Sequence, residues 1–216
     1  MDITTVIINF QTPDLLDRAV RSFKRFYPET PLIIIDNGSK DLGQSKKLIK
    51  SFGEEFESTE GVFLETNIFH GPAMDLAIKE YVNTKYVFFL DSDTVTKKGG
   101  FLEEMDEIIS SEREIYGMGE IIKANKRGYK SETGKEILLT PYMLINTDLY
   151  SSLRPFIHHG QPTLHNFSDA ASKGFMLKAY KISDYIDHIW RGTADRFGYG
   201  LGFKGKLDYL LNKLGL

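Results

Sequence analysis

One stretch of the sequence, residues 86–94, constrains the fold more than any other. Residues 86–90 are all apolar or aromatic, and a short uninterrupted run of this kind is typical of a strand that is buried on both faces of a parallel sheet. The run continues directly into Asp91, Ser92 and Asp93, so two carboxylates follow the expected carboxyl end of the strand. Open α/β sheets bind their ligands at that edge. Residues 86–94 therefore predict a buried strand that carries acidic side chains to a ligand-binding edge.

The spacing of the two carboxylates indicates what this edge could bind. Side chains alternate along a strand, so Asp91 and Asp93 would lie on the same side if the strand continued. Two carboxylates without a basic residue between them repel each other unless a cation lies there, and Mg²⁺ or Mn²⁺ suits carboxylate oxygen and bridges to phosphate. One interpretation is therefore a site for a metal and a diphosphate. The alternative is a strand end followed by a turn, where Asp and Ser are favoured.

Upstream of residue 86, apolar runs alternate with segments of helical periodicity. The sequence predicts strands at 6–8, 32–35, 61–65 and 86–90, and helices at 13–26, 44–52 and 72–81. Strands and helices that alternate through short connections predict an α/β fold, with a mostly parallel sheet and helices on both faces. In such a sheet the polar residues that follow each strand share one edge. They are Gln11 and Thr12, Asp36 and Asn37, residues 67–71, and Asp91 to Asp93.

The second half of the chain has a different pattern. It predicts helices at 101–109, 147–153 and 168–180 and strands at 115–122 and 137–146. No internal repeat, low-complexity tract or linker interrupts the sequence. A length of 216 residues suits one domain with a full core. We therefore expect a single domain over residues 1–216.

Composition limits the classes of protein that this chain can represent. Hydrophobic residues make up 41% and charged residues 26%, as in globular domains. The 27 basic and 30 acidic residues leave a net charge of −3, which argues against nucleic acid as the main partner. The absence of cysteine excludes disulfides and thiolate metal sites. Neither a signal peptide nor an apolar run of about 20 residues is found, so we expect a cytoplasmic protein.

The order of the motifs resembles that of the family 2-like glycosyltransferases of the GT-A fold. Residues 6–10 resemble the first strand of that family, and residues 35–41 its nucleotide-binding turn. Residues 67–75 resemble the loop and helix before the metal motif, and residues 89–93 the metal motif itself. Residues 142–146 resemble the acceptor-side strand. The resemblance implies one Rossmann-like GT-A domain. Its parts would be a nucleotide-sugar-binding half at 1–95, an acceptor-side half at 96–200 and an amphipathic tail at 201–216.

The resemblance also implies an activity and a cofactor. The activity is the transfer of a sugar, with inversion, from a UDP-, GDP- or dTDP-sugar donor to a hydroxyl of a glycan or another acceptor. The implied cofactor is Mn²⁺ or Mg²⁺, with Asp93 as a metal ligand and Asp91 as a contact of the metal or the ribose. The other implied donor-binding residues are Phe10, Gln11, Thr12, Asp36, Asn37, Asn67, Gly71 and Ser92.

Two positions depart from the family pattern. Asn37 stands where many members have a second acidic residue, which bears on the choice of nucleotide base. Phe69 stands where glycine is common, which bears on the path of that loop.

Histidines gather late in the chain, with four of the five between residues 158 and 188. The segment from His188 resembles one in GT-A enzymes where a histidine completes the metal site and the following loop closes over the diphosphate. Arg191 can bind phosphate through two hydrogen bonds, and Thr193 offers a hydroxyl. We expect His188 to bind the metal and Arg191 and Thr193 to contact the donor. The alternative is a surface turn with Trp190 in the core.

An inverting transfer needs a group that accepts the proton of the acceptor hydroxyl. Asp169 is the expected base, at the start of the helix predicted at 168–180, although an aspartate there commonly only caps the helix. His158 and His159 are expected to orient the acceptor. For the leucine stripe of the tail at 201–216, three roles stay open: docking on the core, pairing in a homodimer, or contact with a membrane surface.

Two other functions stay open from the sequence. A sugar-nucleotide nucleotidyltransferase has a similar sheet, but a glycine-rich loop with Arg or Lys is expected after its first strand, and Gln11-Thr12-Pro13 does not supply one. A catalytically inactive nucleotide-sugar-binding protein would keep the donor site without turnover. Release of free nucleotide from a donor in the presence of Mn²⁺ distinguishes an active enzyme from an inactive one.

Overall fold

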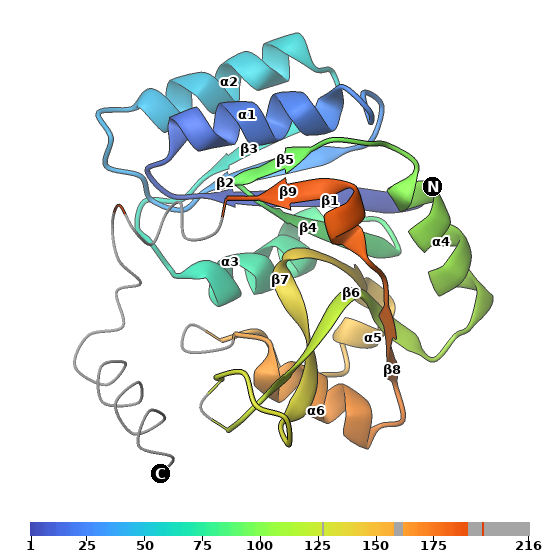
Figure 1. Cartoon of the computed structure of the whole chain (residues 1–216). Helices are drawn as coiled ribbons and strands as arrows, with labels where there is room; N and C mark the ends of the chain where they lie inside the picture. The colour runs from blue at the N-terminus through green and yellow to red at the C-terminus, as the bar shows by residue number, and fades with distance from the viewer. Residues whose placement is uncertain (127, 158–161, 190–195, 197–216) are drawn as a thin grey trace.

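The computed structural model describes residues 1–126, 128–157, 162–189 and 196 of the chain (Figure 1). Its centre is a seven-stranded sheet in the order β3-β2-β1-β4-β7-β6-β8. These strands are β1 (Ile3–Asn9), β2 (Leu32–Asp36), β3 (Thr59–Phe63), β4 (Tyr86–Asp91), β6 (Ile115–Ala124), β7 (Lys135–Asn146) and β8 (Met176–Ala179). A second sheet consists of two short strands, β5 (Thr94–Thr96) and β9 (Ile186–His188).

The first four strands of the large sheet are parallel, as the sequence predicts. β1 pairs with β2 on one side and with β4 on the other, and β2 pairs with β3. Every residue of β1 and β2 is buried, which is typical of strands that are covered on both faces. The register places Asn9 opposite Asp36 and Ile8 opposite Asp91. The carboxyl ends of β1, β2 and β4 therefore meet at one edge.

The second half of the chain extends this sheet with strands of both directions. β7 is antiparallel to β4, β6 is antiparallel to β7, and β8 is parallel to β6. The long β6–β7 hairpin supplies the strand next to the site, because Tyr142 of β7 pairs with Leu90 of β4. The predicted α/β fold with a mostly parallel sheet is confirmed.

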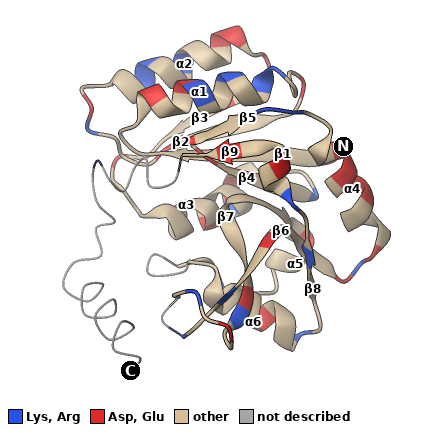
Figure 2. Ribbon diagram, in the orientation of Figure 1, with Lys and Arg blue, Asp and Glu red and all other residues tan. Residues whose placement is uncertain are grey.

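Helices cover both faces of the sheet (Figure 1). On one face, α1 (Pro13–Lys24), α2 (Gln44–Glu55) and α4 (Phe101–Ser111) bury residues such as Leu16, Phe52 and Phe101. On the other face, α3 (His70–Leu76), α5 (Thr147–Tyr150) and α6 (Leu164–Ser172) contribute Met74, Tyr150 and Phe167 to a second apolar cluster. Charged residues of both signs lie along α1 and α2 (Figure 2). Within the described part of the chain, no helix is long and apolar enough to cross a membrane.

Two expectations for the second half are wrong or incomplete. The helix predicted at 168–180 is instead the end of α6 followed by β8, because Gly174 adopts a φ of +80°. This left-handed conformation suits glycine and commonly terminates helices. The sequence also does not predict β5, β8 and β9, which have only three or four residues each. Strands this short do not show a recognisable alternation of apolar and polar residues.

Candidate active site

The acidic pair lies at the carboxyl end of β4 together with a histidine from β9. The Nε2 atom of His188 is 2.9 Å from Oδ1 of Asp93 and 3.8 Å from Oδ2 of Asp91. One ligand atom from each of the three residues lies within 4.8 Å of the others. The side chains of His188 and Asp93 are only 6% and 8% exposed, whereas that of Asp91 is 24% exposed. The structure thus brings together the three side chains that the sequence analysis assigned to a metal.

The small sheet places His188 at this position, although 95 residues separate it from Asp93. Thr94 of β5 pairs with His188 of β9. The backbone N–H of Ile189 donates a hydrogen bond of 2.8 Å to the carbonyl of Asp93. The rings of Tyr142 and His188 also meet edge to face, with 6.1 Å between their centroids. Backbone pairing and ring packing together fix the imidazole beside the acidic pair.

The electrostatics of this cluster suit a cation. Burial is the main influence on the pKa of Asp91 and raises it, since the carboxylate loses solvation. His70 and His188 lower that pKa, whereas the neighbouring charge of Asp93 raises it. A cation among these oxygens would favour their charged forms. Two carboxylates and one imidazole form a donor set that Mn²⁺ accepts, and Mg²⁺ could bind through the carboxylates with phosphate and water.

The turn after β2 is connected to the loop after β1. The side-chain amide of Asn9 donates to Oδ1 of Asp36 at 3.3 Å and to the hydroxyl of Ser45 at 2.9 Å. The hydroxyl of Ser39 donates to the same Asp36 oxygen and accepts the backbone N–H of Gln11 at 2.8 Å. Burial raises the pKa of Asp36, and the hydrogen bonds from Ser39 and Asn9 partly oppose this. Gln11 and Asp36, which are both expected to bind the nucleotide sugar, therefore belong to one hydrogen-bond network.

Asn9 is a site residue that the sequence analysis missed. Its Oδ1 accepts a hydrogen bond of 3.1 Å from the hydroxyl of Thr12, which lies 3.5 Å from the hydroxyl of Ser92. Asn9 thus joins the expected residues Thr12 and Ser92, with Phe10 next to it in the chain, to the turn of Asp36. Asn9 could have been found from its position, because it is a polar residue at the end of an apolar strand.

Asn37 connects the same turn to the loop before α3. Its side-chain N–H donates to Oδ1 of Asn67 at 3.2 Å, and its Oδ1 accepts the backbone N–H of Ile68 at 3.0 Å. Oδ1 of Asn67 also accepts the backbone N–H of Phe69 at 2.7 Å. The side-chain amides of Asn37 and Asn67 therefore fix the loop before α3.

Backbone strain gathers at this edge. In the described ranges, three non-glycine residues have a positive φ, namely Gln11 at 58°, Leu42 at 56° and Phe69 at 71°. They follow β1, β2 and β3, respectively. A left-handed backbone is unfavourable by about 1–2 kcal/mol for such residues, and strain of this kind clusters at functional sites. Phe69 adopts a conformation that favours glycine, which explains why glycine is common at this position in the family.

His70 is the second residue that the sequence analysis did not place in the site. It begins α3, and its Nε2 lies 3.6 Å from Oδ1 of Asp91, on the carboxylate oxygen that does not face His188. Its side chain is 37% exposed. The next residue, Gly71, lies so close to the segment before α6 that a Cβ there would be 1.9 Å from the carbonyl oxygen of Ile157. The sequence analysis placed residues 67–71 at this edge but did not assign His70 to the site.

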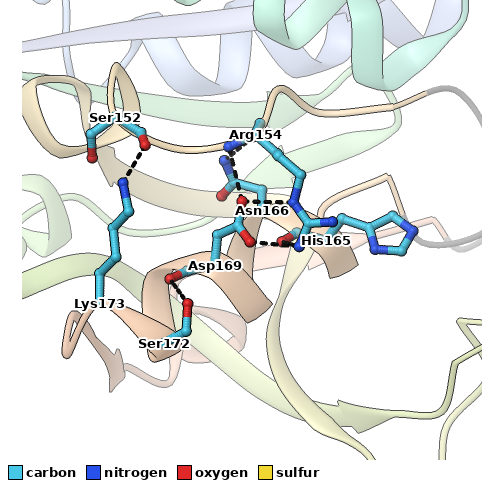
Figure 3. A network of polar contacts seen from close by, with 7 residues as sticks. All are labelled: Ser152, Arg154, His165, Asn166, Asp169, Ser172 and Lys173. Carbon is cyan, nitrogen blue, oxygen red and sulfur yellow. Dashed lines mark hydrogen bonds and ion pairs between the residues drawn. The ribbon is translucent and has the colours of Figure 1, made fainter.

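Asp169 does not lie where the sequence analysis expected it. It belongs to the second half of α6, which begins at Leu164, rather than to the start of a helix. Its carboxylate binds Arg154 through both oxygens, with Nε at 2.7 Å from Oδ2 and Nη2 at 2.5 Å from Oδ1 (Figure 3). The Arg154 guanidinium holds the pKa of Asp169 below its usual range. A carboxylate held in this way is a weak proton acceptor, so the geometry does not support Asp169 as the catalytic base.

The contacts around Arg154 fasten the segment before residue 158 to α6. The side-chain amide of Asn166 donates to the carbonyl of Arg154 at 2.7 Å, and the ammonium of Lys173 donates to the carbonyl of Ser152 at 2.5 Å (Figure 3). The hydroxyl of Tyr116 on β6 donates to Oδ1 of Asn166 at 2.5 Å. These contacts give Asp169 a structural role.

Some expected site residues lie outside the described residues. They are His158, His159, Arg191 and Thr193, together with the tail at 201–216, so these assignments stay predictions. Arg196 is described, and its guanidinium binds both carboxylate oxygens of Asp14, at 2.6 and 2.8 Å. Asp14 lies in the first turn of α1, just after Gln11 and Thr12. Arg196 thus contacts the start of α1, next to the expected donor-binding loop.

The fold and the cluster at its carboxyl edge together define a GT-A domain. The sequence profile described as glycosyl transferase family 2 matches residues 4–185. The chain therefore belongs to glycosyl transferase family 2, as the motifs indicate. No curated protein matches the sequence significantly.

Solved structures of glycosyltransferases share this fold. The mannosyltransferase PcManGT from Pyrobaculum calidifontis, with GDP-Man and Mn²⁺, matches 83% of this chain and 55% of its own, with a TM-score of 0.65 and 11% identity. S. aureus TarS 1–349 with UDP-GlcNAc matches 86% and 58%, with a TM-score of 0.63 and 17% identity. Glucosyl-3-phosphoglycerate synthase from Mycobacterium tuberculosis, with Mn²⁺, UDP and glucosyl-3-phosphoglycerate, matches 99% and 80%, with a TM-score of 0.63 and 15% identity. The chain spans little more than half of the first two proteins, and identities this low show the fold alone.

Proposed function

We propose that this chain is a glycosyltransferase that transfers a sugar from a nucleotide-sugar donor to a hydroxyl of a glycan or another acceptor. The observation that carries the proposal is the cluster of Asp91, Asp93 and His188 at the carboxyl edge of β4, in a chain of glycosyl transferase family 2. Proteins of the same fold were solved with UDP-GlcNAc, with GDP-Man and with UDP. We infer a UDP-, GDP- or dTDP-sugar as the donor.

In this proposal the donor nucleotide lies across the carboxyl ends of β2, β1 and β4. The backbone of residues 10–12 would line the base, and Asp36 and Asn37 would contact the base or the ribose. Neighbouring strands are about 4.8 Å apart, so the backbones of Asp36 and Asp91 are separated by two strand spacings, roughly 10 Å, on either side of β1. The loop and strand-end residues Asn67, Gly71 and Ser92 would complete the donor site.

Asp93, His188 and Asp91 would hold Mn²⁺ or Mg²⁺. When bound, such an ion neutralises the negative charge that develops on the leaving diphosphate. The chain contributes preorganisation, because Asp93 and His188 are nearly buried and are fixed by the pairing of β5 with β9. Ligands that are already in place need little reorganisation when charge develops, which is the most effective form of electrostatic catalysis.

We propose that the transfer inverts the anomeric carbon. The acceptor oxygen forms a bond to that carbon while the bond from the carbon to the diphosphate oxygen breaks, and the acceptor proton passes to a base. Asp169 is not the proposed base, because Arg154 occupies both of its carboxylate oxygens. His158 and His159 remain the proposed acceptor-binding residues, and Arg191 and Thr193 the proposed contacts of the diphosphate.

The proposal is tested by thermal shift, followed by an assay of nucleotide release. UDP, GDP and dTDP and their glucose, N-acetylglucosamine and mannose conjugates are added to the chain with and without Mn²⁺. A ligand that binds only the folded state raises the melting temperature. We expect one base to stabilise the chain only with Mn²⁺, and one of its sugar conjugates to release free nucleoside diphosphate. The variant Asp93→Asn is the matched control and should show neither effect.

Other outcomes of this experiment separate the alternatives. Stabilisation by a nucleotide sugar without any release would favour an inactive binding protein. Formation of pyrophosphate from a nucleoside triphosphate and a sugar 1-phosphate would favour a nucleotidyltransferase. If no nucleotide stabilises the chain with or without Mn²⁺, the proposal of a nucleotide-sugar site is contradicted.

A further inference from the structure

We propose that His70 is a positioning residue that holds Oδ1 of Asp91 and thereby directs Oδ2 of the same carboxylate toward His188 and Asp93. The proposal rests on the proposed function, because it assumes that Asp91 serves a metal. His70 lies 3.6 Å from Oδ1, and His188 lies 3.8 Å from Oδ2. The two imidazoles therefore approach the carboxylate at different oxygens. His70 lies outside the cluster of ligand atoms within 4.8 Å of one another, which comprises Asp91, Asp93 and His188.

Among the described side chains, these two histidines orient the carboxylate of Asp91. Across the described residues, no other side chain forms a hydrogen bond or ion pair with this carboxylate. The outer torsion of an aspartate is broad, so an unrestrained carboxylate samples many directions. Holding one oxygen restricts the direction of the other. Removal of a group that orients a metal ligand typically changes metal affinity by about 10–100-fold.

The backbone around His70 is fixed on both sides, which gives its ring a defined origin. Before it, the left-handed Phe69 follows a loop that Asn37 and Asn67 hold by hydrogen bonds. After it, Gly71 lies against the carbonyl of Ile157 without room for a Cβ. A distance of 3.6 Å is somewhat longer than a hydrogen bond, and a ring that is 37% exposed can adjust by that amount. Its exposure also means that the ring can be replaced without opening the core.

The test measures binding of Mn²⁺ alone, from the signal of free Mn²⁺ in electron paramagnetic resonance. His70→Ala removes the donor, and His70→Gln keeps a side-chain N–H. We expect His70→Ala to raise the Kd for Mn²⁺ about 10-fold, and His70→Gln to restore most of the affinity. His165→Ala, which replaces an exposed histidine on α6, is the matched control and should bind Mn²⁺ as the wild type does. Circular dichroism and the melting temperature verify that each variant is folded.

A second measurement separates positioning from direct ligation. In pulsed resonance spectra, a coordinated imidazole couples its nitrogen to Mn²⁺, and this coupling should persist in His70→Ala because His188 supplies it. Loss of the nitrogen coupling in His70→Ala would make His70 a ligand and overturn its positioning role. Wild-type affinity in a folded His70→Ala would also overturn the proposal while leaving the proposed function intact. If the wild type itself does not bind Mn²⁺, the metal dependence and the role of His70 fail together.

Discussion

The carboxyl end of β4 and the helix α6 each carry an acidic residue that faces a nitrogen base, yet the two regions differ in what they can bind. Asp93 is nearly buried and faces the imidazole of His188. Asp169 is 25% exposed, and both of its oxygens are held by the guanidinium of Arg154. A neutral imidazole can bind a metal beside a carboxylate, whereas a guanidinium keeps its charge and its hydrogen bonds. The contact between Asp93 and His188 can therefore be replaced by contacts of both residues with a cation. The ion pair between Asp169 and Arg154 has no such alternative.

The two regions also differ in how charge affects folding. At the carboxyl edge of the sheet, burial raises the pKa of Asp36 and of Asp91, so ionisation of these groups opposes folding at neutral pH. On α6, Arg154 lowers the pKa of Asp169, so ionisation of this group favours folding. Unfavourable charge and a strained backbone thus gather at the edge that we assign to the donor. This arrangement is expected of a site that is preorganised for a ligand.

The largest contrast is expected in catalysis. Asp93→Asn removes a charged ligand from the buried cluster, and we expect Mn²⁺-dependent turnover to fall by about 1,000-fold, or roughly 4 kcal/mol in the barrier. Asp169→Asn should leave turnover close to that of the wild type, because its partner is Arg154. Release of nucleoside diphosphate, measured for both variants side by side, provides the comparison. A loss in Asp169→Asn as large as that in Asp93→Asn would restore Asp169 as a catalytic residue.

A smaller contrast is expected in the requirement for metal. His188→Ala removes the imidazole from the cluster and should raise the Mn²⁺ concentration needed for half-maximal turnover by about 10–100-fold. The maximal rate at saturating metal should change less. His165→Ala on α6 is the control and should leave the metal requirement unchanged. An unaltered metal titration in His188→Ala would show that the contact with Asp93 is only structural.

The opposite pKa shifts predict opposite effects on stability. The raised pKa of Asp36 means that its stabilising effect is present below the unfolded pKa and is lost as the pH rises through the folded pKa. Asp36→Asn should therefore raise the melting temperature by a few degrees at neutral pH, even though donor binding weakens. The lowered pKa of Asp169 means that its stabilising effect is present above the unfolded pKa and is lost as the pH falls through the folded pKa. Asp169→Asn should therefore lower the melting temperature at neutral pH.

Both differences should shrink in acid, where the wild-type carboxyls are protonated. Calorimetric scans from neutral to acid pH provide the measurement. Shifts of the same sign at neutral pH in the two variants would contradict the contrast between the regions.

The smallest effect is expected at the ion pair between Asp14 and Arg196. Exposed pairs contribute little to stability, so neither Asp14→Arg nor Arg196→Asp should unfold the chain. Each reversal should weaken binding of nucleoside diphosphate with Mn²⁺ by about 3-fold, because it breaks the contact of Arg196 with the start of α1, next to the proposed donor-binding loop. The double variant with exchanged charges should recover the affinity. Calorimetric titration of the wild type, both single variants and the double variant tests this. If the double variant binds nucleoside diphosphate as weakly as the single variants do, the ion pair does not contribute to donor binding.

Local sequence patterns determined most of the first half of this protein. The strands β1, β2 and β4 each contain a continuous apolar run that ends in a polar residue. The topology of a parallel sheet then requires those groups to share an edge. For this reason Asp36, Asp91 and Asp93 could be placed from the sequence. Asn9 ends an apolar run in the same way, so its place at this edge could also be read from the sequence. Its hydrogen bond to Asp36 and the contact of His70 with Asp91 could not, because they depend on side-chain directions that no periodicity encodes.

In the second half, tertiary structure decided what the sequence left open. β5 and β9 are too short to have a pattern of their own, and they exist because each supplies the hydrogen-bonding partner of the other. His188 reaches Asp93 only through that pairing, so its place rested on resemblance until the fold was known. The same limit explains why Asp169 was expected to be the base. The local sequence around a helical aspartate does not show whether its carboxylate faces a substrate or Arg154. Contacts between residues far apart in the chain depend on packing in three dimensions, which the local sequence does not specify.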